Sequence, residues 1–351
     1  MIETDALIVG AGPAGLFQAF QLGLQEIRAH IVDVLPHVGG QCAALYADKP
    51  IYDIPGVPAC TGRELVAALQ QQAEPFAPGL HLGQEVTALA AEPDGRWRLV
   101  TSSGQAFLAR SVFIAAGIGA FEPRRLRIDG LARFEGANLH HHLPDAALLA
   151  GRALAIVGGG EDAVAAALQA ARAAAPPSSI TLVHRKDAFE ADARDLAALQ
   201  ALRDAGRVQV AIGQPTGFGA DGDRLTHLVL SHAEGPDTRL ALDRLLVRQG
   251  LSPRLGALAG WGLAMERKQL VVDPASCATA LPGVYAVGDV NHYPGKKKLI
   301  LCAFHEATLA AYDAAERLQT ARKVVVEYTT TSTRLHRLLG LAADGGTAPR
   351  R

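Results

Sequence analysis

The stretch ALIVGAGPAG, residues 6–15, decides the fold of this chain. Its four leading apolar residues predict a buried parallel strand, and a helix-forming segment follows at 16–24. Gly10 permits a tight turn, Gly12 lets the backbone approach a pyrophosphate, and Gly15 lets the helix lie close to the strand. The next apolar strand, 30–32, ends in Asp33, which is placed to accept hydrogen bonds from a ribose diol. This order predicts a dinucleotide site, and a plain glycine turn in an ordinary α/β protein is the alternative.

Size and composition suit a protein with two domains. The chain has 351 residues, of which 49% are apolar and 20% charged, and its formal net charge is -1. A near-neutral chain offers a nucleic acid or an anionic membrane no long-range attraction. The sequence shows no signal peptide and no apolar run of transmembrane length, so we expect a cytoplasmic protein.

Four cysteines are present, Cys42, Cys60, Cys277 and Cys302, and none belongs to a CxxC motif or has metal-ligand spacing. We therefore expect free thiols in a reducing compartment.

The middle of the chain repeats the opening unit. Residues 153–157 predict a strand, and Gly158, Gly160 and Ala163 form a GxGxxA turn before a helix at 164–174. The following strand, 180–183, ends in His184, Arg185 and Lys186 instead of an acid. The repeat predicts a second nucleotide site.

Other patterns complete the expected architecture. We expect an irregular loop at 35–46, helices at 62–72, 299–318 and 335–339, a small meander at 85–89, 97–101 and 106–108, and strands at 112–116, 208–211, 228–230, 244–247 and 283–290. The fold class is α/β with two Rossmann-like, three-layer ββα nucleotide-binding domains, the second inserted in the first. The expected boundaries are 1–117 and 283–340 for the first domain, 118–282 for the second, and 341–351 for a disordered tail.

Several of these motifs resemble those of a known family. The two glycine motifs, the crossing at 115–117 and the Gly288-Asp289 pair resemble the FAD/NAD(P)-binding flavoprotein reductases of the thioredoxin-reductase group. Within that group the chain is similar to ferredoxin–NADP reductases of the thioredoxin-reductase-like type in the segments 38–41, 44–46, 51–56, 261–263, 293–296 and 328–330. The resemblance covers nearly the whole chain, from about residue 5 to about residue 340.

One absence separates the chain from thioredoxin reductases. Those enzymes carry CxxC before the second glycine motif, where this chain has 134–142 with three consecutive histidines. Without a dithiol, electrons must leave directly from the flavin. Adjacent histidine side chains diverge, so we expect no metal site there, only a surface or interface segment.

The resemblance implies roles around FAD. Tyr46 would stack on one face of the flavin, and Tyr328 would stack on the other and move aside for nicotinamide. Asp289 would accept from a ribityl hydroxyl, and Thr329 and Thr330 would lie near N5. The implied FAD-binding residues are Gly10, Gly12, Gly15, Asp33, Gln41, Tyr46, Asp289 and Thr329. It remains open whether Tyr46 is an ordinary core aromatic, Tyr328 simply ends a strand, and Asp289 merely caps a turn.

The NADP site would use Gly158, Gly160, Ala163, Arg185 and Lys186, the two basic residues binding the 2′-phosphate. The family pattern continues with Phe and Arg, whereas this chain has Phe189 and Glu190. We still expect NADP(H) to be preferred over NAD(H).

The resemblance also implies a homodimer with ferredoxin or flavodoxin as partner, and no catalytic base. Lys296, Lys297, Lys298, Arg124 and Arg125 are candidates for a basic docking face, or are simply solvated loop charges. Two alternatives remain: an NADH-preferring or broad-acceptor flavin reductase, which Glu190 favours, and a non-catalytic FAD-binding redox sensor.

Overall fold

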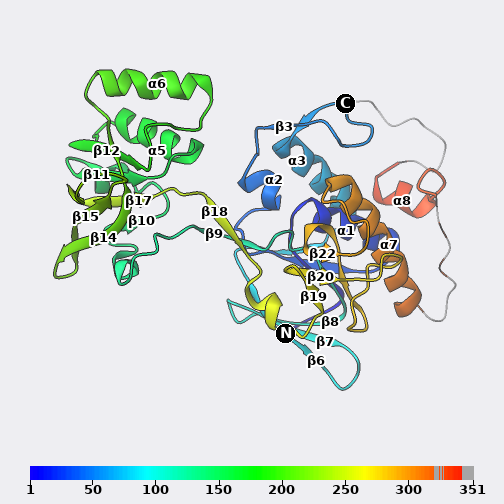
Figure 1. Cartoon of the computed structure of the whole chain (residues 1–351). Coiled ribbons are helices and arrows are strands. Elements are labelled where there is room, and N and C mark those ends of the chain that lie inside the picture. Colours follow the sequence, from blue (N-terminus) through cyan, green and yellow to red (C-terminus); the bar gives the residue numbers. More distant parts are fainter. Residues whose placement is uncertain (320–323, 325, 327, 342–351) are drawn as a thin grey trace. The chain divides into compact units, whose positions relative to one another are not determined.

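The computed structural model describes residues 1–319, 324, 326 and 328–341 and divides into two units (Figure 1). The first unit comprises Met1–Ala120 and the chain from Pro253 onward, and the second comprises Phe121–Ser252. The expected α/β fold with one unit inserted in the other is therefore confirmed. The predicted disordered tail lies, from residue 342, outside the described residues.

The first unit is built on a sheet whose central strand is β1 (Ile2–Val9). The sheet contains β2 (Ala29–Val32), β5 (Gly79–His81), β6 (Val86–Ala91), β7 (Trp97–Thr101), β8 (Ala106–Ile114) and β21 (Val284–Ala286). Strand β8 pairs with antiparallel β7 along its first half and with parallel β21 along its second. The residue pairs Val9–Val32, Val9–Ile114 and Ala286–Ile114 bring four strand ends to one edge. Ligands of such sheets bind at this carboxyl edge.

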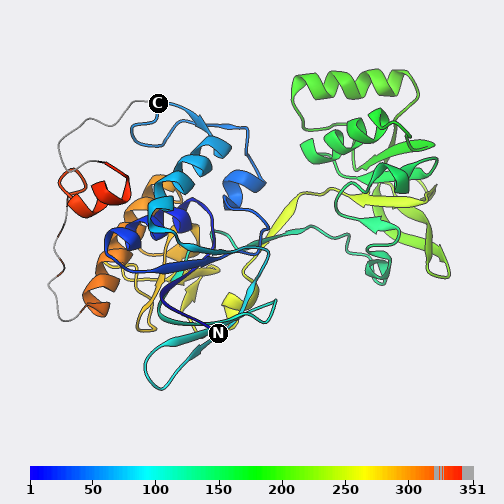
Figure 2. The same ribbon diagram turned by 180° about the vertical axis from the view of Figure 1, so that it is seen from behind.

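Helices cover one face of this sheet. They are α1 (Pro13–Leu24), α3 (Gly62–Ala73) and α7 (Ile300–Leu318). Their buried side chains form one core with the sheet, for example Leu16, Leu69 and Ala311 around Ile8. On the opposite face, a second core joins Leu7 of β1 to Trp97 of the β6–β7 meander and to the segment around Leu258 (Figures 1 and 2). The unit therefore has the expected three layers.

The second boundary differs from the expected one. We predicted it at residue 282, whereas the structure places it at Ser252. The reason is packing: Leu258, Trp261, Leu263 and Leu270 share a core with Leu7 of β1.

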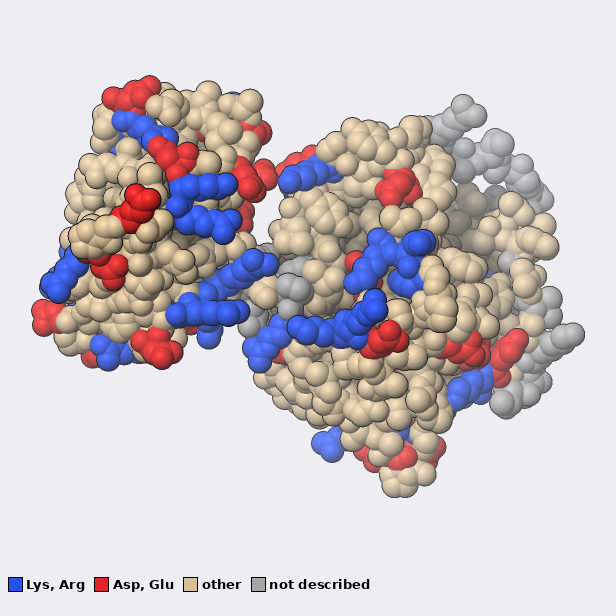
Figure 3. Space-filling view, viewed as in Figure 1, with Lys and Arg blue, Asp and Glu red and all other residues tan. Residues whose placement is uncertain are grey.

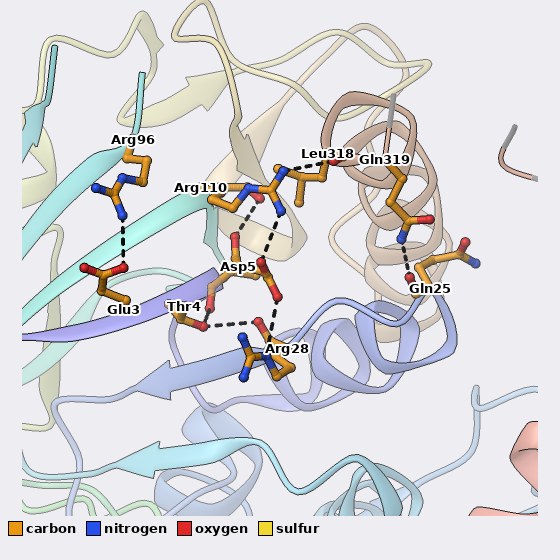
Figure 4. Close-up of polar contacts among 11 residues, drawn as sticks. Glu3, Thr4, Asp5, Gln25, Arg28, Arg96, Arg110, Leu318 and Gln319 are labelled. Carbon is orange, nitrogen blue, oxygen red and sulfur yellow. Dashed lines mark hydrogen bonds and ion pairs between the residues drawn. The ribbon is translucent and has the colours of Figure 1, made fainter. Parts of the chain in front are cut away.

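Polar contacts connect the side of the sheet opposite the ligand edge to the end of α7 (Figure 4). Asp5 accepts from Arg110 at 3.2 Å and lies 3.6 Å from Arg28. Arg110 also donates to the carbonyl of Leu318, the last residue of α7, at 2.9 Å. Basic side chains commonly satisfy the last carbonyls of helices. These contacts fix the C-terminal end of α7 to the start of the sheet.

Shorter elements complete the first unit: α2 (Gly40–Ala44), β3 (Pro50–Ile51), β4 (Cys60–Thr61), β19 (Met265–Glu266), β20 (Gln269–Val271), β22 (Asn291–His292) and α8 (Thr333–Leu338). Arg334 of α8 donates to the carbonyls of Gly23 and Leu24 at the C-terminus of α1. Strands β9 (Ala120–Pro123) and β18 (Leu251–Arg254) pair where the chain passes between the units.

The second unit repeats the plan with a parallel sheet in the order β10-β17-β11-β12-β13. Its elements are β10 (Leu139–His140), α4 (Ala146–Leu149), β11 (Ala153–Val157), α5 (Glu161–Arg172), β12 (Ser179–His184), α6 (Ala193–Asp204), β13 (Gln209–Ile212), β14 (Gln214–Asp221), β15 (Arg224–Ser231), β16 (Thr238–Ala241) and β17 (Arg244–Val247). Helices α5 and α6 cover one face, and the antiparallel β14–β16 ribbon covers the other.

Three local predictions need correction. The segments 106–108 and 112–116 form one strand, β8, because its two halves pair with different neighbours. The expected loop at 35–46 contains the helix α2, which follows Gly39 in the left-handed conformation. The strand expected at 283–290 ends at Ala286 and is followed by a 3-10 turn at Gly288–Val290. Among the described residues, no helix has the length and apolarity to cross a bilayer.

Candidate functional site

The first glycine turn connects β1 to α1 at the ligand edge. Gly10 has φ of +114°, and a Cβ there would overlap the carbonyl oxygen of Ala115. A Cβ on Gly15 would overlap the carbonyl oxygen of Gly10, so only glycine fits both positions. Gly12 has open space, with its nearest neighbour, Gly40, 3.8 Å from a built Cβ. As N-cap of α1 it supplies no side-chain cap. The turn thus offers a helix N-terminus that an anion can approach.

Asp33 follows β2 at the same edge. Its carboxylate accepts from the backbone amide of Ala11, within the glycine turn, and from that of Leu35 at 2.7 Å. Burial raises the pKa of Asp33, and the two amide hydrogen bonds oppose this rise. The acid is thereby fixed beside the turn, as a ribose contact requires.

Helix α2 and the residues directly after it bring two further predicted residues to this region. Gln41 donates to the Asp289 carboxylate at 3.3 Å, which joins residues from opposite ends of the chain. Tyr46 is half-buried, and its hydroxyl lies 3.5 Å from the Cys42 thiol. Burial raises the pKa of the Tyr46 phenol, which therefore stays neutral.

A cavity of 580 Å³ lies beside Tyr46. Its lining includes Tyr52, Lys298, Leu299 and Ile300. Ile300 begins α7, whose N-cap provides no side-chain cap and whose first turn contains no acid. The positive end of a long helix dipole therefore lies next to this cavity.

These residues fit FAD. The glycine turn leaves space for a pyrophosphate, and Asp33 is hydrogen-bonded to that turn. The cavity is lined by an aromatic ring and by an uncapped helix N-terminus. Such a site provides for each part of a flavin dinucleotide: anionic phosphates, a diol and a flat ring system.

The two candidates near the C-terminus are Tyr328 and Thr329. Tyr328 is 72% exposed, and its carbonyl accepts from Thr331. Thr329 is also exposed. Within the described part of the chain, neither residue forms a hydrogen bond or a ring contact with Tyr46. Their predicted flavin contacts remain predictions.

The three lysines proposed for a basic docking face differ in exposure. Lys296 is buried, with a side chain 5% exposed, and pairs with Glu306. It is therefore not available to a partner, and the prediction is wrong for this residue. Lys297 and Lys298 are exposed. Arg125, in the other unit, pairs with Glu135 at 3.2 Å, which weakens its case as a docking charge. Figure 3 shows Lys and Arg side chains gathered on the visible face of each unit.

The second glycine turn has the same design. A Cβ on Gly158 would overlap the carbonyl oxygen of Arg248 and come within 2.9 Å of the Ala163 side chain. Gly160, the N-cap of α5, has nothing within 4 Å of a built Cβ. Asp162 in the first helical turn lies 3.4 Å from Arg248. This pairing offsets a negative charge where a phosphate would bind.

A loop after β12 carries the basic candidates. The His184 ring lies over Gly159, and its Nδ1 is 3.1 Å from the carbonyl oxygens of Lys186 and Ala188. The Glu190 amide donates to the Gly159 carbonyl at 2.8 Å. The loop is therefore tied to the glycine turn at both ends, while the side chains of Arg185 and Lys186 are exposed.

The sequence did not reveal some residues that shape these sites. Glu306 and Gln269 bind the backbone of the Gly288–Asp289 turn, and Arg248 pairs with Asp162 at the second glycine turn. One signal was available: Glu306 interrupts the small apolar side chains, such as Ala303 and Ala310, that α7 places at helical spacing.

Comparison with known proteins agrees with this geometry. The pyridine nucleotide-disulphide oxidoreductase family matches residues 4–326. The chain is 56% identical over 352 residues to a ferredoxin–NADP reductase of Paracidovorax citrulli, with 98% of each chain covered. It is 58% identical over 343 residues to one from Acidovorax sp. (strain JS42), with 96% of each covered.

Solved structures share the fold at low sequence identity. Thioredoxin reductase of T. acidophilum superposes with a TM-score of 0.59 at 22% identity, covering 91% of this chain and 100% of its own. Bacillithiol disulfide reductase of Staphylococcus aureus gives a TM-score of 0.62 at 14% identity, covering 92% of this chain and 100% of its own.

Proposed function

The chain belongs to the pyridine nucleotide-disulphide oxidoreductase family, and we propose that it is a ferredoxin–NADP reductase of the thioredoxin-reductase-like type. The observation that carries the proposal is the pair of glycine turns, one followed by Asp33 and the other by the basic loop with Arg185 and Lys186. The first unit binds FAD, and the second binds NADP(H).

The flavin supplies the electron chemistry when bound: it takes a hydride from NADPH and passes electrons singly to an iron–sulfur protein. The residues of the chain bind and orient FAD and NADP(H). The FAD-binding residues are Gly10, Gly12, Gly15, Asp33, Gln41, Tyr46, Asp289 and Thr329. Tyr46 and Tyr328 would stack on the flavin ring, and Tyr328 would move aside for nicotinamide. The NADP-binding residues are Gly158, Gly160, Ala163, Arg185 and Lys186.

Sulfur takes no part in this electron path. The four cysteines are free thiols, and the sequence contains no CxxC motif. Burial raises the pKa of the Cys42 thiol, the one closest to Tyr46, so it carries little thiolate. Reduction of thioredoxin is therefore not expected.

The acceptor docks beside the cavity at Tyr46. Lys298 lines that cavity, and its neighbour Leu299 is 42% exposed. An apolar centre flanked by positive charge suits an acidic redox partner. Flavodoxin is the second partner in this proposal. The enzyme works in the cytoplasm as a homodimer. Analytical ultracentrifugation of the purified protein tests the homodimer.

An anaerobic titration with NADPH and NADH in parallel tests the proposal. We expect one equivalent of NADPH to bleach the flavin absorbance near roughly 450 nm. Glu190 supports a second candidate, an NADH-preferring reductase, for which NADH would bleach the flavin at lower concentration than NADPH. If neither nucleotide bleaches the bound flavin, the protein is a non-catalytic FAD binder and the proposal fails.

A further inference from the structure

A buried carboxylate lies directly behind the turn that carries Asp289. Glu306 of α7 is 1% exposed and accepts four hydrogen bonds. Its donors are the Gly288 amide at 2.7 Å, Asn291 Nδ2 at 2.9 Å, Tyr293 Oη at 2.9 Å and the Lys296 ammonium. These four donors satisfy the buried carboxylate.

The Lys296 ammonium completes the arrangement. In addition to its pairing with Glu306, it donates to the carbonyl of Gly288 at 2.9 Å. One ion pair therefore holds both backbone polar groups of Gly288, whose φ of +82° is unfavourable for other residues. Asp289 is the next residue.

The rest of the turn is fixed as well. Gln269 donates to the carbonyl of Asp289 at 3.1 Å and to that of Asn291 at 2.7 Å. Gln41 holds the Asp289 carboxylate itself. A buried ion pair is costly compared with apolar packing, so it contributes little to stability on balance. What this pair does contribute is a defined position for the turn.

We propose that Glu306 and Lys296 are positioning residues that hold the Gly288–Asp289 turn in its flavin-binding conformation, and that their opposite charges act on the electron affinity of the flavin in opposite directions. The inference rests on the proposed function for the assignment of FAD to this turn. Neither side chain is exposed enough to touch a ligand directly, so both act through Gly288.

The test uses Glu306→Gln and Lys296→Met in the full chain, with FAD affinity measured by reconstitution of the apoprotein. Each variant is expected to raise the FAD dissociation constant about tenfold, because the remaining charge is left unpaired beside the turn. Amide hydrogen exchange of Gly288 in the apoprotein is expected to accelerate in both variants. The matched controls are Glu316→Gln, an exposed acid of the same helix, and Lys297→Met, the exposed neighbour.

The flavin midpoint potential separates this role from a merely structural one. Glu306→Gln removes a negative charge near the flavin and is expected to raise the potential. Lys296→Met removes a positive charge near the flavin and is expected to lower the potential. Shifts of the same sign, or unchanged FAD affinity in either variant, overturn the inference.

The double variant Glu306→Gln/Lys296→Met keeps the test decisive if a single variant does not fold. It leaves no charge unpaired and is expected to fold, yet to bind FAD about tenfold more weakly, because the Gly288 carbonyl loses its Lys296 donor and the Gly288 amide keeps only a neutral acceptor. FAD binding as tight as that of the unchanged chain overturns the inference. Failure of the unchanged chain to bind FAD at all is a different result, which overturns the proposed function instead.

Discussion

Replacing Glu190 by arginine is expected to strengthen NADPH binding. The Glu190 amide donates to the Gly159 carbonyl at 2.8 Å, so this residue is anchored at the second glycine turn. It follows Arg185 and Lys186 in a loop whose other end His184 holds against the same turn. A negative side chain here opposes a 2′-phosphate held by the two basic residues.

The size of the effect follows from Coulomb's law. A unit charge about 6 Å from another interacts by ~0.7 kcal/mol in water, and physiological salt reduces this to roughly half. A phosphate carries about two negative charges. Exchanging glutamate for arginine therefore favours NADPH by about 1–2 kcal/mol, or about tenfold in affinity.

Steady-state reduction of a neutral dye, with NADPH and NADH varied separately, measures the effect. Glu190→Arg should lower the Michaelis constant for NADPH about tenfold and leave that for NADH nearly unchanged, because NADH lacks the 2′-phosphate. Glu234→Arg, at an exposed acid of the same unit, is the control for net charge. An unchanged NADPH constant, or an equal fall for NADH, refutes the assignment of this loop to the 2′-phosphate.

Gly15→Ala should abolish FAD binding, because the added Cβ overlaps the Gly10 carbonyl. Urea unfolding should show a loss of stability of about 1–3 kcal/mol. The control Gly260→Ala, at a position with open space around it, should change neither property. Lys298→Glu should raise the Michaelis constant for ferredoxin about tenfold at low salt, and added salt should slow ferredoxin turnover far more than dye turnover; equal salt effects would remove this residue from the docking surface. Burial lowers the pKa values of His30 and His81 below their ordinary 6.5. The unfolded chain then binds more protons, so stability should be lost as pH falls below 6.5, and His81→Phe should flatten this dependence in denaturant titrations.

The strand–turn–helix units were predictable because their signals are local. Helix α1 was expected at 16–24 and occupies Pro13–Leu24, and β11 has the bounds that were predicted. Each of these elements combines an apolar strand with glycines whose positions the chain geometry demands. The neighbourhood of Asp33 was predictable for the same reason, since the residue follows β2 directly.

Features that depend on distant partners were not predictable. The domain boundary shifts because Trp261 packs with Leu7, which is far away in the sequence. In the sequence, Lys296 cannot be told apart from Lys297 and Lys298. It is buried because it pairs with Glu306 of α7, a contact that appears only in the structure. The contact between Gln41 and Asp289 also joins distant segments. Local sequence periodicity does not predict contacts between such distant residues.

The most direct test of the account is NADPH-dependent reduction of cytochrome c by the FAD-loaded protein, with and without ferredoxin. The account predicts a rate that rises with ferredoxin concentration and saturates, and that thioredoxin cannot support, because electrons leave from the flavin and not through a dithiol. A rate that ferredoxin leaves unchanged contradicts it.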